Sequence, residues 1–565
     1  MASGVARRLR APLVYLLLAL AGHAGALVDL GRRTQCACGD LPQTDWFLGW
    51  TPHALLAGRS PWFSHALALP GGVNLTWNTL LPLPGLLAAP VTLTAGPVAA
   101  HTVLAVLAFA GSATSMWWVA GRWAPWPPAR FAAGLLYGFS PYLVGQGLGH
   151  LNLSLVALPP LVLLLLDDLL VRQSGPAWRP GALLGLVALA QLLTTEEVLA
   201  STFLLCVLGL VVLAAQHRSL VRARLRYAVL GLATAVGVLA AGAAWPLSVQ
   251  FLGPRRVTAP VQSSTRFAAD LLGAVVPTTH QLLGTTLTRT WGGNTIENGS
   301  YLGPPLLAVL GVLAWRCRRL PVVRWAVPFT AGALVLSLGE SLHVAGSDTG
   351  LPLPFAALAR LPVLGNLAAV RLSLYVVLGA ALLLAVGLDR VRPGRRWAPV
   401  AGLCLLALLP AWPYRYVDAR VPAYFTSAAV ERVPAGAVAL TFPLARVGTS
   451  TPMHWQAFAG YRYASPGGYV ITPLPGGRGT FRGDPLTVER VFGLARTGRR
   501  LPDPDGRVGS SVRGELARLH VDAVLVPAQE PGAAAVTGWF TGLLGRGPDE
   551  LRGGVAAWYA LDRPS

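Results

Sequence analysis

The stretch GRRTQCACGDLPQTDWFLGWTPHALLAGRSPWFSHALALPGGVNLTWNT, residues 31–79, follows a first apolar run over 12–30. It is too polar to cross a bilayer, yet it is dense in Trp, Phe, His and Asp. Its aromatic and apolar residues recur at roughly helical spacing, which predicts an amphipathic helix over 45–58 that lies in the membrane interface, where Trp is favoured. Two acids, Asp40 and Asp45, stand at the entrance of this helix. We therefore expect this loop to carry the chemistry of the protein.

The composition is that of a polytopic α-helical membrane protein. Mean hydropathy is +0.54, and 53% of the 565 residues are hydrophobic while only 12% are charged. The formal charge of +21 would suggest nucleic acid in a soluble chain, but here the arginines separate apolar spans, as membrane topology requires. Nucleic-acid binding is therefore excluded. The chain uses Arg without Lys and is rich in Ala, Leu, Gly and Pro, which indicates a high-GC bacterial genome such as that of an actinobacterium.

About eleven apolar runs are long enough to be membrane spans, and we expect about 11 to 13 transmembrane helices in all. Besides 12–30, which we interpret as an uncleaved first helix, the runs lie near 100–120, 131–148, 151–171, 181–194, 196–215, 227–250, 301–316, 323–340, 366–388 and 397–412. The run 80–99 is apolar but contains four prolines, so we expect a re-entrant or interfacial segment, or a pair of half-spans.

The arginines favour a topology in which 80–99 does not fully cross. With a cytoplasmic N-terminus, every Arg cluster between spans then lies on the cytoplasmic side, as the positive-inside rule requires. These clusters are Arg122/Arg130, Arg172/Arg179, Arg218/Arg222/Arg224/Arg226, Arg316/Arg318/Arg319/Arg324 and Arg390/Arg392/Arg395/Arg396. Loop 31–79, the polar turns near 150 and 195, loops 251–300 and 341–365 and the C-terminal region after Trp412 consequently share the outer face. A site built from these segments faces away from the cytoplasm, so its donor cannot be a cytosolic nucleotide.

The composition becomes that of a soluble protein after residue 412. Short apolar strands near 438–442, 523–526 and 555–561 alternate with helical patterns over 513–519 and 533–544. This alternation predicts a small extracytoplasmic α/β domain over 413–565, beside a transmembrane domain over 1–412. The aromatic, Arg-bearing segment 454–462 of this domain is suited to contacts with sugars.

Sugar transfer from a lipid-linked phosphate requires a carboxylate that deprotonates the acceptor hydroxyl, and cations that stabilise the departing phosphate. Carboxylates near a bilayer are costly and usually functional, although each can also be a helix cap or a solvated loop acid. The candidate acids are Asp40, Asp45, Glu196 and Glu197. Guanidinium groups bind phosphate bidentately, although each outer Arg can also serve topology alone. The candidate phosphate ligands are Arg255, Arg256 and Arg371.

Further polar and aromatic residues of the outer segments are candidates for substrate contacts. They are Gln43, Trp46, His53, Asn74 and His150, with Glu297 and His343 as weaker candidates. Cys36 and Cys38 form a C-x-C pair, but no His or further Cys stands at ligand spacing from them, so we expect no zinc site there.

Five motifs carry a resemblance to a known family. They are GD-x-x-Q-x-x-WFLGW (39–50), HALLAGRSPWFS (53–64), PGGVNLTWNT (70–79), GFSPYLVGQGLGHLNL (138–153) and TTEEVL (194–199). The layout resembles the GT-C superfamily of polyprenyl-phosphate-sugar-dependent membrane glycosyltransferases, and the motifs are similar to a set of actinobacterial predicted membrane glycosyltransferases. The resemblance implies that the first-loop acid falls on Asp40, six residues before Trp46, which makes Asp40 the candidate base and Asp45 the alternative.

The resemblance also implies a polyprenyl-phosphate sugar as donor and a hydroxyl of a glycan, lipid or protein as acceptor, at the outer face of the cytoplasmic membrane. The superfamily often has two adjacent first-loop acids or an acid-x-acid metal motif. Here Asp40 and Asp45 are five residues apart, so no metal ligands are assigned, and a divalent Mg or Mn ion stays open as a cofactor. Two other functions compete with sugar transfer: transport or flipping of a lipid-linked saccharide, and a noncatalytic role in envelope assembly. Transporters tend to show repeated halves and polar residues at mid-membrane, whereas here polar residues gather at outer helix ends.

Overall fold

The computed structural model describes residues 2–35, 39–259, 261, 265–361 and 363–561. Cys36 and Cys38 lie outside these residues. The described chain forms two compact units. Unit 1 contains Met1–Leu27, Val103–Ala244 and Gln262–Arg415, and unit 2 contains Val28–Thr102, Trp245–Val261 and Tyr416–Ser565. The first polar loop therefore belongs to the same unit as the C-terminal region, and the domain boundary expected after residue 412 stays a prediction.

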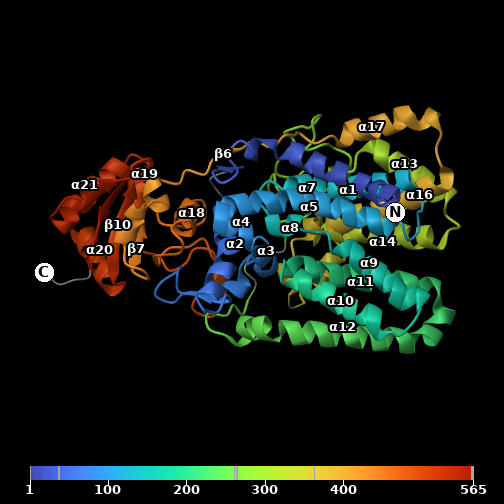
Figure 1. Cartoon of the computed structure of the whole chain (residues 1–565), viewed down its shortest axis with the longest axis horizontal. Coiled ribbons are helices and arrows are strands. Elements are labelled where there is room, and N and C mark those ends of the chain that lie inside the picture. Colours follow the sequence, from blue (N-terminus) through green and yellow to red (C-terminus); the bar gives the residue numbers. More distant parts are fainter. Residues whose placement is uncertain (1, 36–38, 260, 262–264, 362, 562–565) are drawn as a thin grey trace. The chain divides into compact units, whose positions relative to one another are not determined.

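Unit 1 is built almost entirely of helices (Figure 1). Helices α5 (Pro97–Ala120) and α12 (Arg218–Leu252) have residues in both units. The other helices are α1 (Ala2–Gly22), α6 (Pro127–Gly138), α7 (Pro141–Gln146), α8 (Leu151–Ser154), α9 (Pro159–Asp167), α10 (Trp178–Leu192), α11 (Glu196–Gln216), α13 (Pro304–Arg316), α14 (Pro321–Ser337), α15 (Phe355–Leu358), α16 (Ser373–Val391) and α17 (Ala398–Leu408). The strands β4 (Ser341–Val344) and β5 (Ser347–Pro352) form an antiparallel hairpin.

Among the described residues, five helices are long and apolar enough to cross a membrane. They are Pro97–Ala120, Leu151–Arg172, Glu196–Gln216, Arg218–Leu252 and Ala369–Val391. Shorter apolar helices lie at Leu9–Gly22, Pro304–Arg316 and Pro321–Ser337, where prolines interrupt or begin the helix. The structure is thus helical with several candidate spans, and the larger number of spans expected from the sequence stays a prediction.

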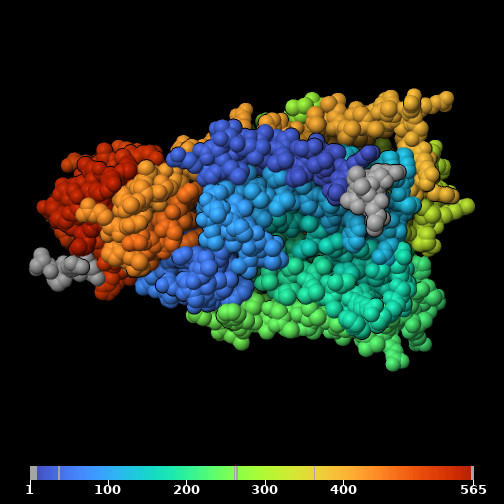
Figure 2. Space-filling model, viewed as in Figure 1, coloured from blue at the N-terminus to red at the C-terminus, as the bar shows by residue number. Residues whose placement is uncertain are grey.

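Helix α16 is the centre of unit 1. Nearly all of its residues are buried, and it packs against α6, α13 and α14. By contrast, α12, green in Figure 2, leaves much of its apolar surface exposed, as expected for a helix whose outer face meets lipid. Arg371 lies two residues before the start of α16. Because α16 is enclosed by protein, Arg371 is held among protein side chains.

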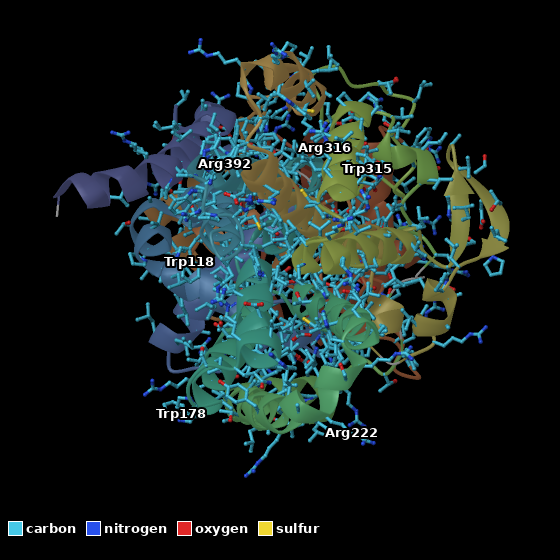
Figure 3. The ribbon with its side chains drawn as sticks, turned by 90° about the vertical axis from the view of Figure 1, so that its right-hand side faces the viewer. Trp118, Trp178, Arg222, Trp315, Arg316 and Arg392 are labelled. Carbon is cyan, nitrogen blue, oxygen red and sulfur yellow. The ribbon has the colours of Figure 1, made fainter. Side chains whose placement is uncertain are left out.

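Exposed Trp and Arg side chains lie at the end of unit 1 that faces the viewer in Figure 3. Trp118, Trp178 and Trp315 are each more than half exposed, and Arg222, Arg316 and Arg392 are exposed near them at helix ends. Trp is enriched at both membrane interfaces, whereas Arg is enriched on the cytoplasmic side. These six residues lie in or beside the Arg clusters that the topology assigns to the cytoplasm.

Residues 80–99 form two short helices of unit 2, α3 (Pro82–Leu87) and α4 (Ala89–Ala95), before α5 begins at Pro97. Each has Pro in its first turn, where the missing N–H costs no hydrogen bond. A helix of six or seven residues is about 10 Å long and cannot cross a bilayer of about 30 Å.

The first polar loop contains a helix, α2 (Leu41–Leu56), that begins four residues before the predicted one because Pro42 fits its first turn and Asp40 is its N-cap residue. Thirteen of its sixteen residues are buried, and it packs against α3, α4 and α18 (Thr451–Phe458). The helix is therefore more enclosed than an amphipathic helix with one exposed face, and its expected place in the membrane interface stays a prediction. Both its polar and its aromatic faces are covered by protein.

The other elements of unit 2 are mostly short strands and helices of the C-terminal region. They are β1 (Arg33–Thr34), β2 (Phe63–Ser64), β3 (Val73–Asn74), β6 (Val417–Asp418), β7 (Val438–Thr441), β8 (Thr472–Pro473), β9 (Gly479–Thr480), α19 (Thr487–Arg496), α20 (Arg507–Arg518), β10 (Val521–Pro527), α21 (Ala533–Leu544), β11 (Glu550–Arg552) and β12 (Val555–Trp558). Four strands form a mixed sheet in the order β11-β12-β10-β7, in which β7 and β10 are parallel and the other pairs antiparallel.

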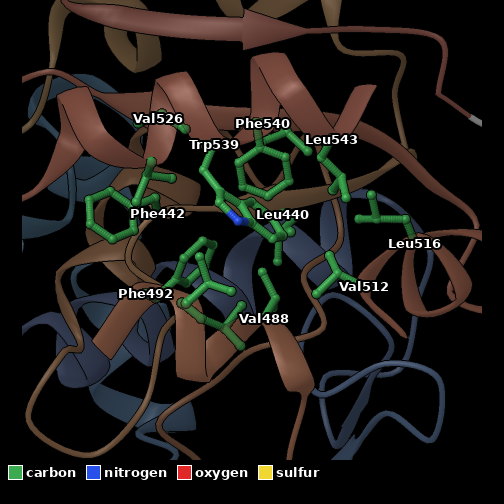
Figure 4. Packing of buried hydrophobic residues seen from close by; sticks show 14 of the residues in the cluster. Leu440, Phe442, Val488, Phe492, Val512, Leu516, Val526, Trp539, Phe540 and Leu543 are labelled. Atoms are coloured by element: carbon green, nitrogen blue, oxygen red, sulfur yellow. The ribbon is translucent and has the colours of Figure 1, made fainter. Parts of the chain in front are cut away.

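Helices α19, α20 and α21 cover one face of this sheet. Figure 4 shows Trp539, Phe540 and Leu543 of α21 packed over Leu440 of β7 and Val526 of β10. Apolar residues recur every three to four positions in these helices, so they form one face, and that face packs on the sheet. Strands are thus present near the three positions expected from the sequence.

Candidate active site

Asp45 is a buried carboxylate in the middle of α2. Its side chain is 1% exposed, and each of its two oxygens is held by an imidazole. Oδ1 lies 2.7 Å from Nδ1 of His101, in the first turns of α5, and Oδ2 lies 2.5 Å from Nε2 of His454 on α18. We call these three residues the Asp45 cluster. All three belong to unit 2.

The electrostatics of the Asp45 cluster favour a charged carboxylate. Burial alone would raise the pKa of Asp45, but the two histidines outweigh it and lower the pKa below its usual value. An ionised carboxylate accepts hydrogen bonds only, so both imidazoles donate to it through the nitrogens named above. Each of these charge-assisted bonds contributes about 1.5–3 kcal/mol.

Hydrogen bonds to the 454–469 segment fix α2 on both sides of Asp45. Trp46 Nε1 donates to Gln456 Oε1 (2.7 Å), and the Tyr461 hydroxyl donates to the Trp46 carbonyl (2.8 Å). Gly49 allows this approach, since a Cβ there would lie 2.3 Å from the Tyr461 hydroxyl oxygen. Gln43 Nε2 donates to the Tyr469 carbonyl (2.5 Å). The side chains of Gln43 and Trp46 thus position α2, and their expected contact with substrate stays a prediction.

The segment 454–462 was expected to contact sugar, but its first three residues are buried. His454 binds Asp45, and Trp455 stacks on Phe425 with ring centroids 5.3 Å apart. Gln456 Nε2 donates to the carbonyls of Ala66 and Tyr463. These side chains are used for packing and for the Asp45 cluster, because α18 lies directly against α2.

A small pocket opens beside Asp45. Its lining includes Arg33, Thr34, Asp45, His101, Thr102 and Tyr416. Arg33 Nη2 donates to the Tyr416 carbonyl (2.8 Å), and the Arg33 Nε atom is buried without a hydrogen-bond partner in the described part of the chain. The pocket therefore combines a guanidinium group with the carboxylate–imidazole pair of Asp45 and His101.

A second group of buried charges lies in unit 1 around Arg371. Arg371 Nε donates to both Glu297 oxygens at 3.0 and 3.1 Å, Nη2 also bonds Glu297, and Nη1 bonds Glu197. Gln146 Nε2 donates to Glu297 (2.9 Å), and Gln146 Oε1 accepts from His150 Nδ1 (2.7 Å). We call these five residues the Arg371 cluster.

The charges of the Arg371 cluster compensate one another. Burial would raise the pKa of Glu297, but Arg371, His150 and Gln146 outweigh it and lower the pKa to about 2. All three guanidinium nitrogens of Arg371 donate to Glu297 or Glu197. Bidentate binding of a phosphate by Arg371 would therefore require one of these ion pairs to break. The structure brings Glu197, His150 and Arg371 together, as three of the predicted site residues, and adds Glu297 and Gln146.

The remaining predicted residues lie at helix ends and loop contacts. Asp40 is the N-cap residue of α2, where its carbonyl accepts from the N–H and the hydroxyl of Thr44. Glu196 is the exposed first residue of α11. Asn74 Nδ2 donates to the carbonyls of Val249 and Pro254 (2.9 and 3.0 Å), so this amide holds the end of α12.

His53, Arg255 and Arg256 lie in unit 2. The half-buried His53 ring is 4.6 Å from that of Tyr461, and burial lowers the pKa of His53. Arg256 donates to the Phe251 carbonyl (3.2 Å) and is otherwise exposed. The Arg255 guanidinium lies against Gly71, where a Cβ would come within 3.0 Å of Cζ, and its Nε has no hydrogen-bond partner in the described segments.

The residues that the structure describes form no ready-made site for a divalent metal. No three His, Cys, Asp or Glu side chains among them are placed to hold an ion. In the Asp45 cluster both carboxylate oxygens contact imidazole nitrogens at hydrogen-bond distance, which leaves no space for an ion between them. We therefore derive no step through a metal.

His101 was not among the site residues predicted from the sequence, and Glu297 was only a weaker candidate. His101 is a lone ionisable residue in an apolar span, a feature that marks functional residues in membrane helices. Glu297 lies in a long polar loop that has neither a helical or strand periodicity nor a known motif. Its contact with Arg371 is seen only in the folded structure.

Comparison with protein-family models and with curated proteins gives no match. Among solved structures, the chain is similar to the arabinofuranosyltransferase AftD from Mycobacteria, with a TM-score of 0.54 and 16% identity over 93% of this chain and 36% of AftD. It is also similar to the oligosaccharyltransferase of Archaeoglobus fulgidus tethered to an acceptor peptide, with a TM-score of 0.46 and 12% identity over 95% of this chain and 71% of that one. The same organism's AglB, in complex with an inhibitory peptide and a dolichol-phosphate, gives a TM-score of 0.45 and 12% identity over 96% and 71% of the chains.

The chain spans about a third of the length of AftD, and at this identity the likeness concerns the fold. AftD is a membrane glycosyltransferase of the GT-C superfamily. The resemblance noted in the sequence motifs is thereby confirmed at the level of architecture. The chain has the fold of the GT-C membrane glycosyltransferases.

Proposed function

We propose that the protein is an integral-membrane glycosyltransferase that moves a sugar from a polyprenyl-phosphate-linked donor to an acceptor hydroxyl on the outer face of the cytoplasmic membrane. The observation that carries the proposal is the Asp45 cluster, which joins the first polar loop to α5 and α18 in a chain with a GT-C fold. An ionised carboxylate that is 1% exposed is costly to bury. Two histidines from distant parts of the chain compensate this cost, and such arrangements are typical of catalytic sites.

The reaction requires one proton transfer and one bond exchange. The acceptor oxygen attacks the anomeric carbon, and the bond between that carbon and the phosphate oxygen breaks. The electron pair of the broken bond stays on the phosphate, which leaves as polyprenyl phosphate. The proton of the acceptor hydroxyl passes to a base of the Asp45 cluster, and such assistance contributes about 10² to 10⁴ in rate. Asp40, the base implied by the family resemblance, is the alternative.

The departing phosphate needs a cation. Arg255 and Arg256 are the candidates in unit 2, the unit that contains the Asp45 cluster. The Arg255 guanidinium has a buried Nε without a hydrogen-bond partner among the described residues and forms no ion pair there, whereas Arg371 is paired with two carboxylates. Arg255 is therefore the favoured phosphate ligand. The acceptor is a glycan, lipid or protein hydroxyl, and because AftD is named an arabinofuranosyltransferase, a pentose is the first donor sugar to test.

Analysis of lipid-linked sugars in a strain lacking this protein tests the proposal. We expect one polyprenyl-phosphate sugar to accumulate on the outer leaflet, and wild-type protein, but not Asp45→Asn, to restore the normal pool. Periodate applied to intact spheroplasts reports the leaflet, because it oxidises only sugars on the outer face. Accumulation confined to the inner leaflet would instead identify a flippase. An unchanged pool would contradict both functions.

A further inference from the structure

The Asp45 carboxylate is poorly placed to accept a proton from a substrate. Both of its oxygens already accept hydrogen bonds, at 2.7 and 2.5 Å, and its side chain is 1% exposed. Each oxygen retains a further lone pair, so the burial of the carboxylate, and not its existing hydrogen bonds, is what limits contact with an acceptor hydroxyl. The histidines themselves differ in access. The His454 side chain is fully buried, whereas His101 lines the pocket together with Asp45 and, at 11% exposure, is the more accessible of these two side chains.

The bond to Asp45 fixes the tautomer of His101. Because an ionised carboxylate can only accept, His101 Nδ1 carries the proton, and Nε2 of the neutral ring has a free lone pair. Among the residues that the structure describes, His101 forms no hydrogen bond other than that to Asp45. Nε2 is therefore an unoccupied proton acceptor on a ring whose orientation is fixed.

We propose that His101, and not a carboxylate, is the catalytic base, and that Asp45 orients its ring. The proposal rests on the proposed glycosyltransferase function and names the atom that performs its proton transfer. The pocket has room for about one water-sized group, so the acceptor inserts only its hydroxyl there. The hydroxyl gives its proton to His101 Nε2 as its oxygen bonds the anomeric carbon. The bond from that carbon to the phosphate breaks, and the phosphate keeps the electron pair. The imidazolium later returns the proton to the polyprenyl phosphate or to water.

The surroundings of His101 stabilise the imidazolium that this step creates. The negative charge of Asp45 lies 2.7 Å from Nδ1, and attraction at such a distance is strong away from water. His454, on the far oxygen of Asp45, completes the hydrogen bonds of the carboxylate. Arg33 lines the same pocket and would oppose a second positive charge. This repulsion partly offsets the attraction between the imidazolium and Asp45.

His101→Asn separates the catalytic role of the ring from its structural role. The Asn amide can reproduce the Nδ1 donor to Asp45 but has nothing at the position of Nε2. With full-length protein in liposomes and decaprenyl-phosphate arabinofuranose and decaprenyl-phosphate mannose as donor probes, we expect kcat to fall about 10² to 10⁴-fold while donor binding is retained. His343→Asn, which changes a histidine outside both clusters, is the matched control.

Imidazole rescue identifies the atom that acts. We expect added imidazole to restore part of the transfer activity of His101→Ala, because the small ring can enter the space that the side chain leaves, and we expect no such rescue of Asp45→Asn. A His101→Asn enzyme with wild-type kcat beside an inactive Asp45→Asn would assign the base to Asp45 and overturn the inference. Wild-type protein that binds both probes and transfers neither sugar to membranes of the deletion strain would instead contradict the proposed function. The two failures are therefore distinguishable.

Discussion

Neutralising Glu297 tests the electrostatics of the Arg371 cluster. The buried Glu297 carboxylate accepts hydrogen bonds from Arg371 and Gln146, and its pKa is lowered from 4.5 to about 2. One pKa unit corresponds to about 1.4 kcal/mol. Ionised Glu297 therefore contributes about 3 kcal/mol to the free energy of unfolding at neutral pH. Because the folded pKa is the lower one, this contribution is complete above about pH 5 and is lost as the pH falls from 4.5 toward 2.

Glu297→Gln keeps the shape of the side chain and removes its charge. We expect the free energy of unfolding at pH 7 to fall by about 3 kcal/mol, since Arg371 loses one of its two carboxylate partners. We also expect the variant to lose less stability than the wild type between pH 5 and pH 3. Equilibrium unfolding in mixed micelles, followed by Trp fluorescence at several pH values, measures both quantities.

Asp505→Asn is the matched control for charge removal. Asp505 pairs with Arg513 at 2.8 Å, but its side chain is 78% exposed. Exposed pairs contribute less than about 1 kcal/mol, so this variant should retain both the stability and the acid dependence of the wild type. A Glu297→Gln protein as stable as the wild type at pH 7, with the same loss of stability in acid, would refute the assignment of a buried, ionised Glu297.

Three further predictions concern unit 2 and the topology. Asp45→Asn should lower sugar transfer about 10² to 10⁴-fold, whereas Asp40→Asn, which keeps a good N-cap residue, should stay within about tenfold of wild type; the opposite result would make Asp40 the base. Gly49→Ala places a Cβ 2.3 Å from the Tyr461 hydroxyl and should cost about 1–3 kcal/mol in unfolding free energy. The double variant with Tyr461→Phe should recover part of this loss, and a fully stable single variant would disprove the close approach. In a background without native cysteines, an impermeant thiol reagent should label the exposed position of Ser60→Cys in intact cells and that of Ser219→Cys only after permeabilisation; labelling of Ser219→Cys in intact cells would reverse the topology.

Patterns local in the sequence predicted the helical architecture well. Apolar runs predicted α5, α11, α12 and α16, and the prolines of 80–99 predicted that this segment does not form a continuous span. The family motifs predicted the GT-C fold, which the similarity to AftD supports. Helix boundaries were less accurate. In α2 the N-terminal Pro42 fits the first helical turn, so the helix begins at Leu41.

Contacts between distant residues could not be predicted from one sequence. Asp45 pairs with His101, 56 residues away, and with His454, 409 residues away. The amphipathic pattern of α2 indicated an exposed polar face, but α18 packs against that face. Asp45 is therefore buried, although the sequence suggested an acid at the exposed entrance of a helix. In the same way, Arg371 was expected to bind phosphate. Its ion pairs with Glu197 and Glu297 appear only once the chain is folded, so they could not be predicted from the sequence.

Sugar transfer by the purified, reconstituted protein is the measurement that tests the central claim most directly. Liposomes containing the full chain would receive a polyprenyl-phosphate sugar labelled in the sugar, together with membranes of the deletion strain as the source of acceptor. We expect the label to leave the polyprenyl lipid and appear in an acceptor, with release of polyprenyl phosphate in equal amount, and we expect Asp45→Asn to abolish both. Label that crosses the bilayer while still attached to its lipid would contradict the account and identify a transporter.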